Sequence, residues 1–284
     1  GRRETRGTTW YGDPALSLDG KALFYFRGDA LGDNVYMLDR ATGVEEALTA
    51  QRLPGGQDMK LSVDGHRLAY GHSTDSIARL EYIELPSRQI FGASAHIRAS
   101  TIIPLISGAF VVELSDRSGL GLLDSLGGAL KPLPVPDSLS VVSFAAAPDG
   151  GRVAIVATLR RAAGEGANFG DWSDFGVRTL LVGFVSLTGG EVRIVRVLAS
   201  DEPAPGLSWD RDGKLYLGRW LSTDEGPSIW RLSPADGALS RIADLPAGCS
   251  TSSIAVGALG AAAACSAGDL RGDIWLIDMK GVSR

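Results

Sequence analysis

The sequence predicts an all-β protein folded as a six-bladed β-propeller with four-stranded antiparallel blades. Short apolar runs flank an Asp-Gly turn, as in residues 13–26, where the turn is Asp19-Gly20. The same unit returns near the period of ~40–45 residues that is typical of propeller blades, at residues 59–70, 144–155 and 207–217. Weaker copies at 101–114 and 253–266 complete the set. Because a blade cannot bury both of its faces alone, we expect the repeats to close into one ring.

The residues at the turns fit hairpins. Glycine tolerates positive φ, and the short Asp side chain can accept hydrogen bonds from its own backbone. A second series of turn residues follows in the blades, at Thr42-Gly43, Gly127-Gly128, Gly189-Gly190 and Asp236-Gly237. The segments between turns, such as 23–26, 180–185 and 274–277, are short and rich in β-branched or aromatic residues, which is typical of strands. No amphipathic helical run of useful length is present.

The repeats account for residues 1–284 as a single propeller domain. The blades are expected over residues 11–50, 56–92, 98–134, 140–198, 204–244 and 250–279. The last blade lacks an outer strand, because the chain ends soon after residues 273–279. We therefore expect the N-terminal segment, residues 3–10 and chiefly Glu4–Trp10, to pair beside that strand and to close the ring, which would also cover an exposed sheet edge.

Composition restricts the partners. The net charge is −5 and no basic stripe is present, so nucleic-acid binding is not expected. The sequence contains no apolar run of ~18 residues, the length needed to span a membrane. The chain does not begin with Met and opens with Arg2, Arg3 and Arg6, so we interpret it as a monomeric fragment of a longer protein. Those arginines either flank a membrane helix before Gly1, which would favour an extracytoplasmic domain, or are simply solvated in a cytoplasmic one.

The two cysteines, Cys249 and Cys265, lie in the last blade. Counting outward from the turn at Leu259-Gly260, Cys265 should lie opposite Ile254 and not opposite Cys249. A disulfide requires Cβ atoms within ~4.5 Å of each other. This counting favours free buried thiols over a bridge.

The repeat resembles that of TolB-type six-bladed propellers, on residues 14–25 and on residues 34–49, which end in Ala-Leu-Thr. Cys265 and Gly272–Asp278 further resemble the closing blade of propellers at the C-terminus of bacterial eukaryotic-type serine/threonine kinases and of some winged-helix regulators. That resemblance implies a sensing or interaction role for the propeller. The chain contains no kinase motif, so any such catalysis would reside in another part of the protein.

In such propellers, the loops between second and third strands open on the face where the central tunnel is approached. The longest, residues 160–177, carries Phe169, Trp172 and Phe175 and is the strongest predicted binding loop. Alternatively, its aromatic side chains cover the adjacent blade. Arg219 and Trp220 begin the neighbouring loop of the ring. Arg27 and His72 begin two further loops, and Asp58 starts an inner strand. These eight residues form the predicted ligand- or partner-binding set.

No catalytic residue, metal site or cofactor is predicted. The histidines lack metal-ligand spacing, and no Gly-x-Ser-x-Gly nucleophile elbow is present. Asp13 and Asp58 are the only carboxylates at inner-strand starts, where the other blades offer Thr101, Ser143, Ser208 and Ser253, a poor cation cage. The leading prediction is a non-catalytic sensory or scaffold propeller of a larger bacterial protein, binding a protein or small molecule at the tunnel mouth. The alternatives are a metal-dependent lactonase or cyclase, and a propeller that gates a peptidase.

Overall fold

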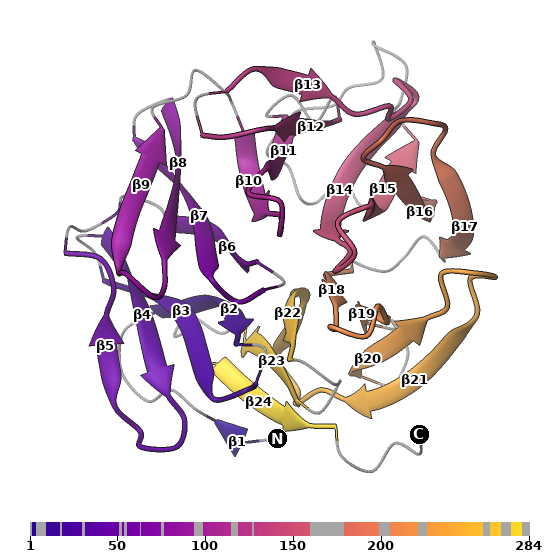
Figure 1. The fold of residues 1–284 in the computed structure, drawn as a ribbon. Helices are drawn as coiled ribbons and strands as arrows, with labels where there is room; N and C mark the ends of the chain where they lie inside the picture. Colours follow the sequence, from indigo (N-terminus) through magenta and orange to yellow (C-terminus); the bar gives the residue numbers. More distant parts are fainter. Residues whose placement is uncertain are drawn as a thin grey trace.

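The computed structural model describes residues 2–3, 10–17, 19–29, 32–50, 53, 56–62, 64–74, 77–93, 99–114, 119–126, 128–159, 179–198, 205–220, 226–257, 262–267 and 274–279. These residues form six four-stranded antiparallel sheets arranged as blades around a ring (Figure 1). The predicted all-β, six-bladed propeller is thereby confirmed. No helix in the described part of the chain is long and apolar enough to cross a membrane.

Each blade is named by its position in the chain, and its strands run from the inside of the ring outward. Blade 1 contains β2 (Trp10–Leu16), β3 (Ala22–Asp29), β4 (Gly32–Asp39) and β5 (Glu45–Ala47). Blade 2 contains β6 (Gly56–Leu61), β7 (Arg67–Thr74), β8 (Ile77–Glu84) and β9 (Gln89–Ala93). Blade 3 contains β10 (Ala99–Pro104), β11 (Phe110–Leu114), β12 (Leu120–Leu123) and β13 (Leu130–Pro132).

The second half of the ring repeats this order. Blade 4 contains β14 (Leu139–Ala146), β15 (Arg152–Leu159), β16 (Leu180–Ser186) and β17 (Arg193–Leu198). Blade 5 contains β18 (Leu207–Trp209), β19 (Leu215–Trp220), β20 (Pro227–Leu232) and β21 (Leu239–Asp244). Blade 6 contains β22 (Cys249–Val256), β23 (Ala262–Ala267) and β24 (Ile274–Asp278), with β1 (Arg2–Arg3) as its outer strand.

The ring closes through the N-terminus, as predicted. Arg2 pairs with Leu276 and Arg3 with Trp275, and Figure 1 shows β1 beside β24. The closing strand begins earlier than expected, however. Trp10 belongs to β2, where it pairs with Gly28, and residues 4–9 lie outside the described residues. The backbone of Arg2 and Arg3 is therefore part of the sheet.

The first turn of a blade is held by side chains as well as by backbone. In blade 1, the Ser17 hydroxyl accepts the N–H of Ala22 at 2.8 Å, and the Asp19 carboxylate accepts the N–H of Lys21 at 3.0 Å. Gly20 has a φ of 70°, which favours glycine there. In blade 5 a buried aspartate replaces the serine, since Asp210 accepts the N–H of Lys214 at 2.9 Å. The repeated hairpin thus tolerates more than one acceptor.

These turns make the fold sensitive to acid. The N–H of Lys21 and the hydroxyl of Ser17 lower the pKa of Asp19, and the N–H groups of Thr42 and Ala41 lower the pKa of Asp39. A carboxylate whose pKa is lower in the folded state stabilises the fold while it is ionised, and this stability is lost as pH falls through the folded pKa.

We therefore expect the free energy of unfolding to fall as pH decreases below ~4, as measured by urea unfolding across a pH series. The double variant Asp19→Asn/Asp39→Asn should show a shallower decrease below that pH, because the neutral amides still accept hydrogen bonds but no longer take up protons. Asp137→Asn, at an exposed carboxylate in another turn, is the matched control. An identical acid slope in the double variant and the wild type would contradict the assignment.

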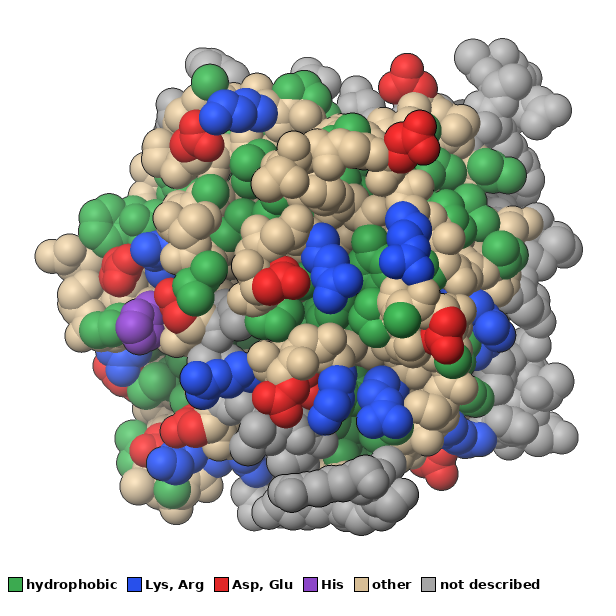
Figure 2. All heavy atoms as spheres, turned by 45° about the vertical axis from the view of Figure 1, so that its right-hand side comes forward, with side chains coloured by type: hydrophobic (Ala, Val, Ile, Leu, Met, Phe, Trp, Pro, Cys, Tyr) green, Lys and Arg blue, Asp and Glu red, His purple; other side chains and the backbone are tan. Residues whose placement is uncertain are grey.

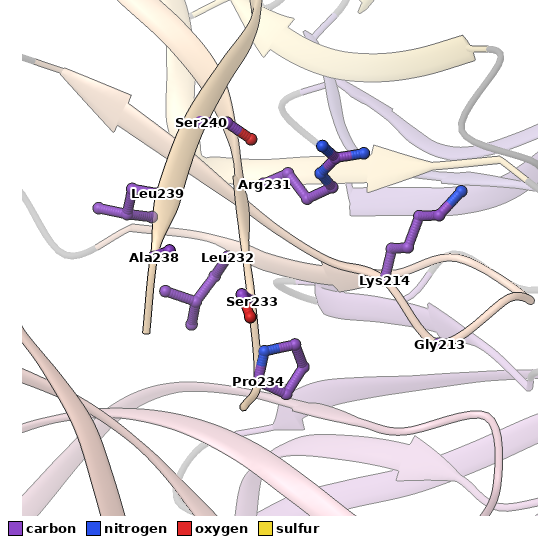
Figure 3. Close-up of a pocket in the computed structure, with 9 residues that line it drawn as sticks. All are labelled: Gly213, Lys214, Arg231, Leu232, Ser233, Pro234, Ala238, Leu239 and Ser240. Atoms are coloured by element: carbon purple, nitrogen blue, oxygen red, sulfur yellow. The ribbon is translucent and has the colours of Figure 1, made fainter. Parts of the chain in front are cut away.

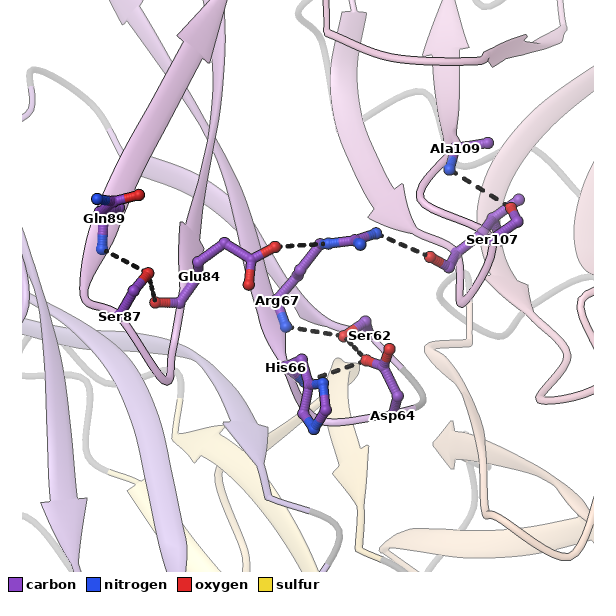
Figure 4. Close-up of polar contacts among 10 residues, drawn as sticks. Ser62, Asp64, His66, Arg67, Glu84, Ser87, Gln89, Ser107 and Ala109 are labelled. Atoms are coloured by element: carbon purple, nitrogen blue, oxygen red, sulfur yellow. Dashed lines mark hydrogen bonds and ion pairs between the residues drawn. The ribbon is translucent and has the colours of Figure 1, made fainter.

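The hydrophobic core is divided among the contacts between blades. Each of the six buried clusters combines residues of two neighbouring blades. Polar side chains also bridge blades: the Arg67 guanidinium donates to Glu84 at 3.0 Å and to the Leu105 carbonyl of blade 3 at 3.4 Å (Figure 4). The Trp209 indole of blade 5 donates to the Ala145 carbonyl of blade 4 at 3.0 Å. Each blade is thus stabilised mainly by its neighbours.

The prediction of free thiols is wrong, because Cys249 and Cys265 form a disulfide with a Cα–Cα distance of 5.8 Å. The expected pairing of Cys265 with Ile254 is confirmed. However, the register shifts between Cys249 and Ile254, so that Cys249 lies opposite Ala267. This irregularity places Cys249 opposite Ala267, which is only two positions from Cys265, and regular counting could not show it.

Candidate functional site

Three of the predicted site residues occupy one equivalent position in three blades. Arg27, His72 and Arg219 lie near the ends of β3, β7 and β19, at the end of each strand opposite the first turn. They pair in register with Asn34, Arg79 and Ser228 of the next strand. From the sequence, these residues are predicted in loops. The structure corrects this, because the β3–β4 ladder continues to Asp29 and Gly32 and the β7–β8 ladder to Thr74 and Ile77.

In blade 1, Arg27 belongs to a fixed polar and aromatic group. Its guanidinium carbon lies 3.9 Å from the centroid of the Tyr36 ring, and it donates a hydrogen bond to the Tyr36 hydroxyl at 2.9 Å. Glu45 forms an ion pair with Arg27 and accepts a hydrogen bond from Tyr25. Burial, followed by the hydrogen bond and charge of Glu45, raises the pKa of Tyr25 far above its usual value. The Arg27 side chain nevertheless remains 31% exposed.

Blade 5 repeats the pair of arginine and aromatic ring. The guanidinium carbon of Arg219 lies 5.1 Å from the centroid of Trp230. The indole N–H of Trp230 donates to the hydroxyl of Ser228 at 2.9 Å, and Ser228 is fully buried. Trp230 follows Ser228 by two residues, just as Tyr36 follows Asn34. In both blades, therefore, an arginine of the second strand packs on an aromatic residue of the third, and both side chains are only partly buried.

The two pairs lie at different contacts between blades. Side chains alternate along a strand, so Arg27 shares its face of β3 with Leu23 and Tyr25, which pack against blade 6. Arg219 shares its face of β19 with Leu215 and Leu217, which pack against blade 4. The structure therefore places Arg27 and Arg219 at the same end of the ring, but it does not bring them together into one site.

The remaining predicted site residues are only partly described. Asp58 lies in β6, within the register shift between Gln57 and Lys60, and β6 pairs with the strand of His72. The side chains of Asp58, His72 and Trp220 are outside the description, and so are residues Phe169, Trp172 and Phe175 of the long loop. Asp13 lies in the corresponding shift of β2, with a φ of 47°. Bulges of this kind re-aim side chains and recur beside functional sites.

Sequence reasoning missed the partners of the arginines: Tyr36, Glu45 and Trp230. A usable signal existed, because Val35-Tyr36 and Ile229-Trp230 occupy the same place in the repeat. Only the pairing register of the second and third strands shows that these aromatic residues lie beside Arg27 and Arg219. As to metals, His, Cys, Asp and Glu residues form no group of three that could hold an ion, within the residues that the structure describes.

A pocket of ≈ 340 Å³ lies at the turn end of blade 5, opposite the end that carries Arg219. In Figure 3, Lys214 and Arg231 extend to one side, and Leu232 and Leu239 to the other. The pocket is lined by Gly213, Lys214, Arg231, Leu232, Ser233, Pro234, Ala238, Leu239 and Ser240. Figure 2, which brings the right-hand side of Figure 1 forward, shows Lys and Arg side chains separated by acidic and hydrophobic ones, without a continuous basic stripe among the coloured residues.

No family model and no curated protein sequence matches the chain. Solved structures do. TolB from Acinetobacter baumannii superposes with a TM-score of 0.58 at 17% identity, over 83% of this chain and 57% of that one, so the chain spans less than two thirds of that TolB. A gluconolactonase from Xanthomonas campestris gives a TM-score of 0.62 at 14% identity, over 97% and 88% of the two chains.

A chain of the mitotic checkpoint complex is similar as well, with a TM-score of 0.58 at 17% identity, over 94% of this chain and 90% of that one. The three proteins differ in their named roles, and at these identities the likeness concerns the fold alone. The protein has the TolB-like six-bladed β-propeller fold.

Proposed function

We propose that this propeller is a non-catalytic protein-binding domain, the sensory or scaffold part of a larger bacterial protein, and that it binds its partner at the ring end where Arg27 and Arg219 lie. The observation that carries this proposal is the repeated pair of arginine and aromatic ring, Arg27 with Tyr36 and Arg219 with Trp230. Arg, Tyr and Trp are the residue types that contribute most of the binding energy at protein interfaces.

Both pairs are held in place before any partner arrives. The Ser228 hydroxyl accepts the Trp230 indole N–H, and Glu45 holds Arg27 against Tyr36. Side chains that are already ordered lose less conformational entropy on binding, which favours affinity. Solved propellers with this fold support the proposal, since one belongs to the mitotic checkpoint complex.

The proposal is tested by affinity capture from the organism of origin, with the wild-type chain and the variants Arg27→Ala and Arg219→Ala as bait. Arg241→Ala is the matched control, because Arg241 is an exposed arginine that pairs with Asp244 on an outer strand. We expect the captured protein to bind the wild type and the control equally well. It should bind Arg219→Ala with about 30-fold lower affinity, the loss that defines a hot spot.

Two results would overturn the proposal. One is a set of bound proteins that is the same for wild type and both arginine variants. The other is turnover of a lactone, ester or peptide by the purified wild-type chain that Asp58→Asn abolishes, which would make the protein an enzyme acting at the tunnel mouth.

A further inference from the structure

The outer strands of a propeller expose one unpaired side, and most of them here carry residues that discourage further pairing. Charged side chains and proline protect sheet edges from other strands. β5 contains Glu45 and Glu46, β13 contains Lys131 and Pro132, β17 contains Arg193 and Arg196, β21 contains Arg241 and Asp244, and β1 is Arg2–Arg3. β9, with the sequence Gln-Ile-Phe-Gly-Ala, contains neither a charge nor a proline.

Two large apolar side chains of β9 are exposed. Ile90 is 44% exposed and Phe91 is 40% exposed. The Phe91 ring stacks on Tyr82 of β8, with centroids 5.0 Å apart and planes inclined by 16°. Tyr82 in turn packs against the buried Phe110 of blade 3, at 5.4 Å between ring centroids. Ile90 and Phe91 therefore make this sheet edge apolar, and the contact with Tyr82 holds the Phe91 ring in place.

The register shows which backbone groups of β9 point outward. Leu85 donates its N–H to His66, on the β7 side of β8. The backbone N–H and C=O groups of successive residues point to alternate sides of a strand. Those of Tyr82, three residues before Leu85, therefore point toward β9. Tyr82 pairs with Phe91, whose own N–H and C=O are therefore used within the blade. The N–H and C=O groups of Ile90 and Gly92 point away from the blade, and no strand of the described structure pairs with them.

We propose that two copies of this chain associate by antiparallel pairing of their β9 strands about a two-fold axis at Phe91. Ile90 of each copy then lies opposite Gly92 of the other, and both residues offer outward N–H and C=O groups, so the pair exchanges hydrogen bonds reciprocally. Self-pairing of β9 brings no like charges together. In β17, by contrast, self-pairing would bring Arg193 and Arg196 of the two copies close together, and like charges across a sheet are destabilising.

The geometry also sets the size and strength of the assembly. The five residues of β9 span ~17 Å, and such a contact is smaller than the interfaces of stable complexes. The dimer is therefore weak and reversible. Among the described outer strands, β9 is the one without a charge or a proline, and each copy uses it in the dimer. A third copy therefore finds no free β9 edge, and no open polymer forms. This proposal differs from the expectation of a monomeric chain.

Sedimentation velocity across a dilution series tests the proposal. The wild type should pass from monomer to dimer as concentration rises. Ile90→Lys, which places two like charges on one face of the joined sheet, should weaken dimerisation by up to about 5-fold. Ile194→Lys is the matched control, because Ile194 is an exposed isoleucine on β17, an outer strand that already carries arginines. It should dimerise like the wild type.

A second variant tests the backbone directly. Gly92→Pro removes an outward N–H and leaves the β8–β9 hydrogen bonds intact, as proline is tolerated on sheet edges. A Cβ at this position would lie 3.2 Å from Cγ of Glu81, a side chain that can shift. Gly92→Pro should keep the circular dichroism spectrum of the wild type but stay monomeric.

Hydrogen exchange locates the contact. The amides of Ile90 and Gly92 should become protected as concentration rises, while the amide of Phe91 is protected at every concentration. A wild type that stays monomeric throughout the series would overturn the proposal. So would dimers of Ile90→Lys or Gly92→Pro as tight as those of the wild type, or equal weakening by Ile194→Lys.

Discussion

Deletion of residues 1–9 is expected to lower the midpoint of thermal unfolding by ~5–10 °C, assuming a loss of a few kcal/mol in a chain of this size. The deletion removes β1 and leaves β24 as an unpaired outer strand in blade 6. It also removes the direct link between the two ends of the ring, Arg2 with Leu276 and Arg3 with Trp275. Differential scanning calorimetry of the full and shortened chains measures the change.

The double variant Arg2→Ala/Arg3→Ala is the control for this experiment. It removes both charges but keeps the backbone hydrogen bonds of β1, so its melting temperature should stay close to that of the wild type. If the double variant is as unstable as the deletion, the arginine side chains and not strand pairing hold the ring. An unchanged melt of the deletion would show that blade 6 is stable without its outer strand.

Loss of the disulfide is expected to have an effect of similar size. Cys249 and Cys265 are separated by 16 residues and are both fully buried. Cross-linking a loop of this length stabilises a protein by about 3 kcal/mol, chiefly by restricting the unfolded chain. The double variant Cys249→Ala/Cys265→Ala should therefore lose about 2–4 kcal/mol of unfolding free energy in urea titrations.

The reduced wild-type chain distinguishes the effect of the cross-link on stability from the effect of side-chain packing, because it loses the S–S bond but keeps both sulfur atoms. It should lose most of the stability that the double alanine variant loses. The unfolded, unreduced protein should also contain no free thiol when titrated with a thiol reagent. Two free thiols, or equal stability of reduced and oxidised chains, would contradict the bridge.

Most of the fold could be predicted from the sequence because the blade is a local unit. Asp19-Gly20 and its repeats signal hairpins through backbone chemistry alone, and the missing outer strand of blade 6 follows from counting strands. The disulfide could not be predicted, since the register shift between Cys249 and Ile254 leaves no pattern in the residues. The boundary between the closing strand and the first inner strand was misplaced for a similar reason: Trp10 is apolar enough for either β1 or β2.

The candidate site was less predictable. Arg27 and Arg219 were predicted as binding residues in loops, because the sequence does not show how far the second and third strands of a blade stay paired, which is to Asp29–Gly32 in blade 1 and to Trp220–Pro227 in blade 5. Their aromatic partners, Tyr36 and Trp230, lie in the following strand, 9 and 11 residues further along the chain. Only the pairing of the two strands brings each arginine onto its ring. The predictions for Phe169, Trp172 and Phe175 stay predictions.

The pairing of Arg3 with Trp275 also has a consequence for synthesis. A ribosome adds ~5–20 residues per second, so the partner of β1 emerges roughly 15–50 s after β1 itself. Throughout that interval Tyr11 and Tyr25 of blade 1 lack the residues of blade 6, Ala264 and Ile274, that cover them in the finished ring. The nascent chain thus carries an uncovered aromatic surface from its first blade until its last. Chaperone binding during translation should therefore concentrate on the N-terminal blade.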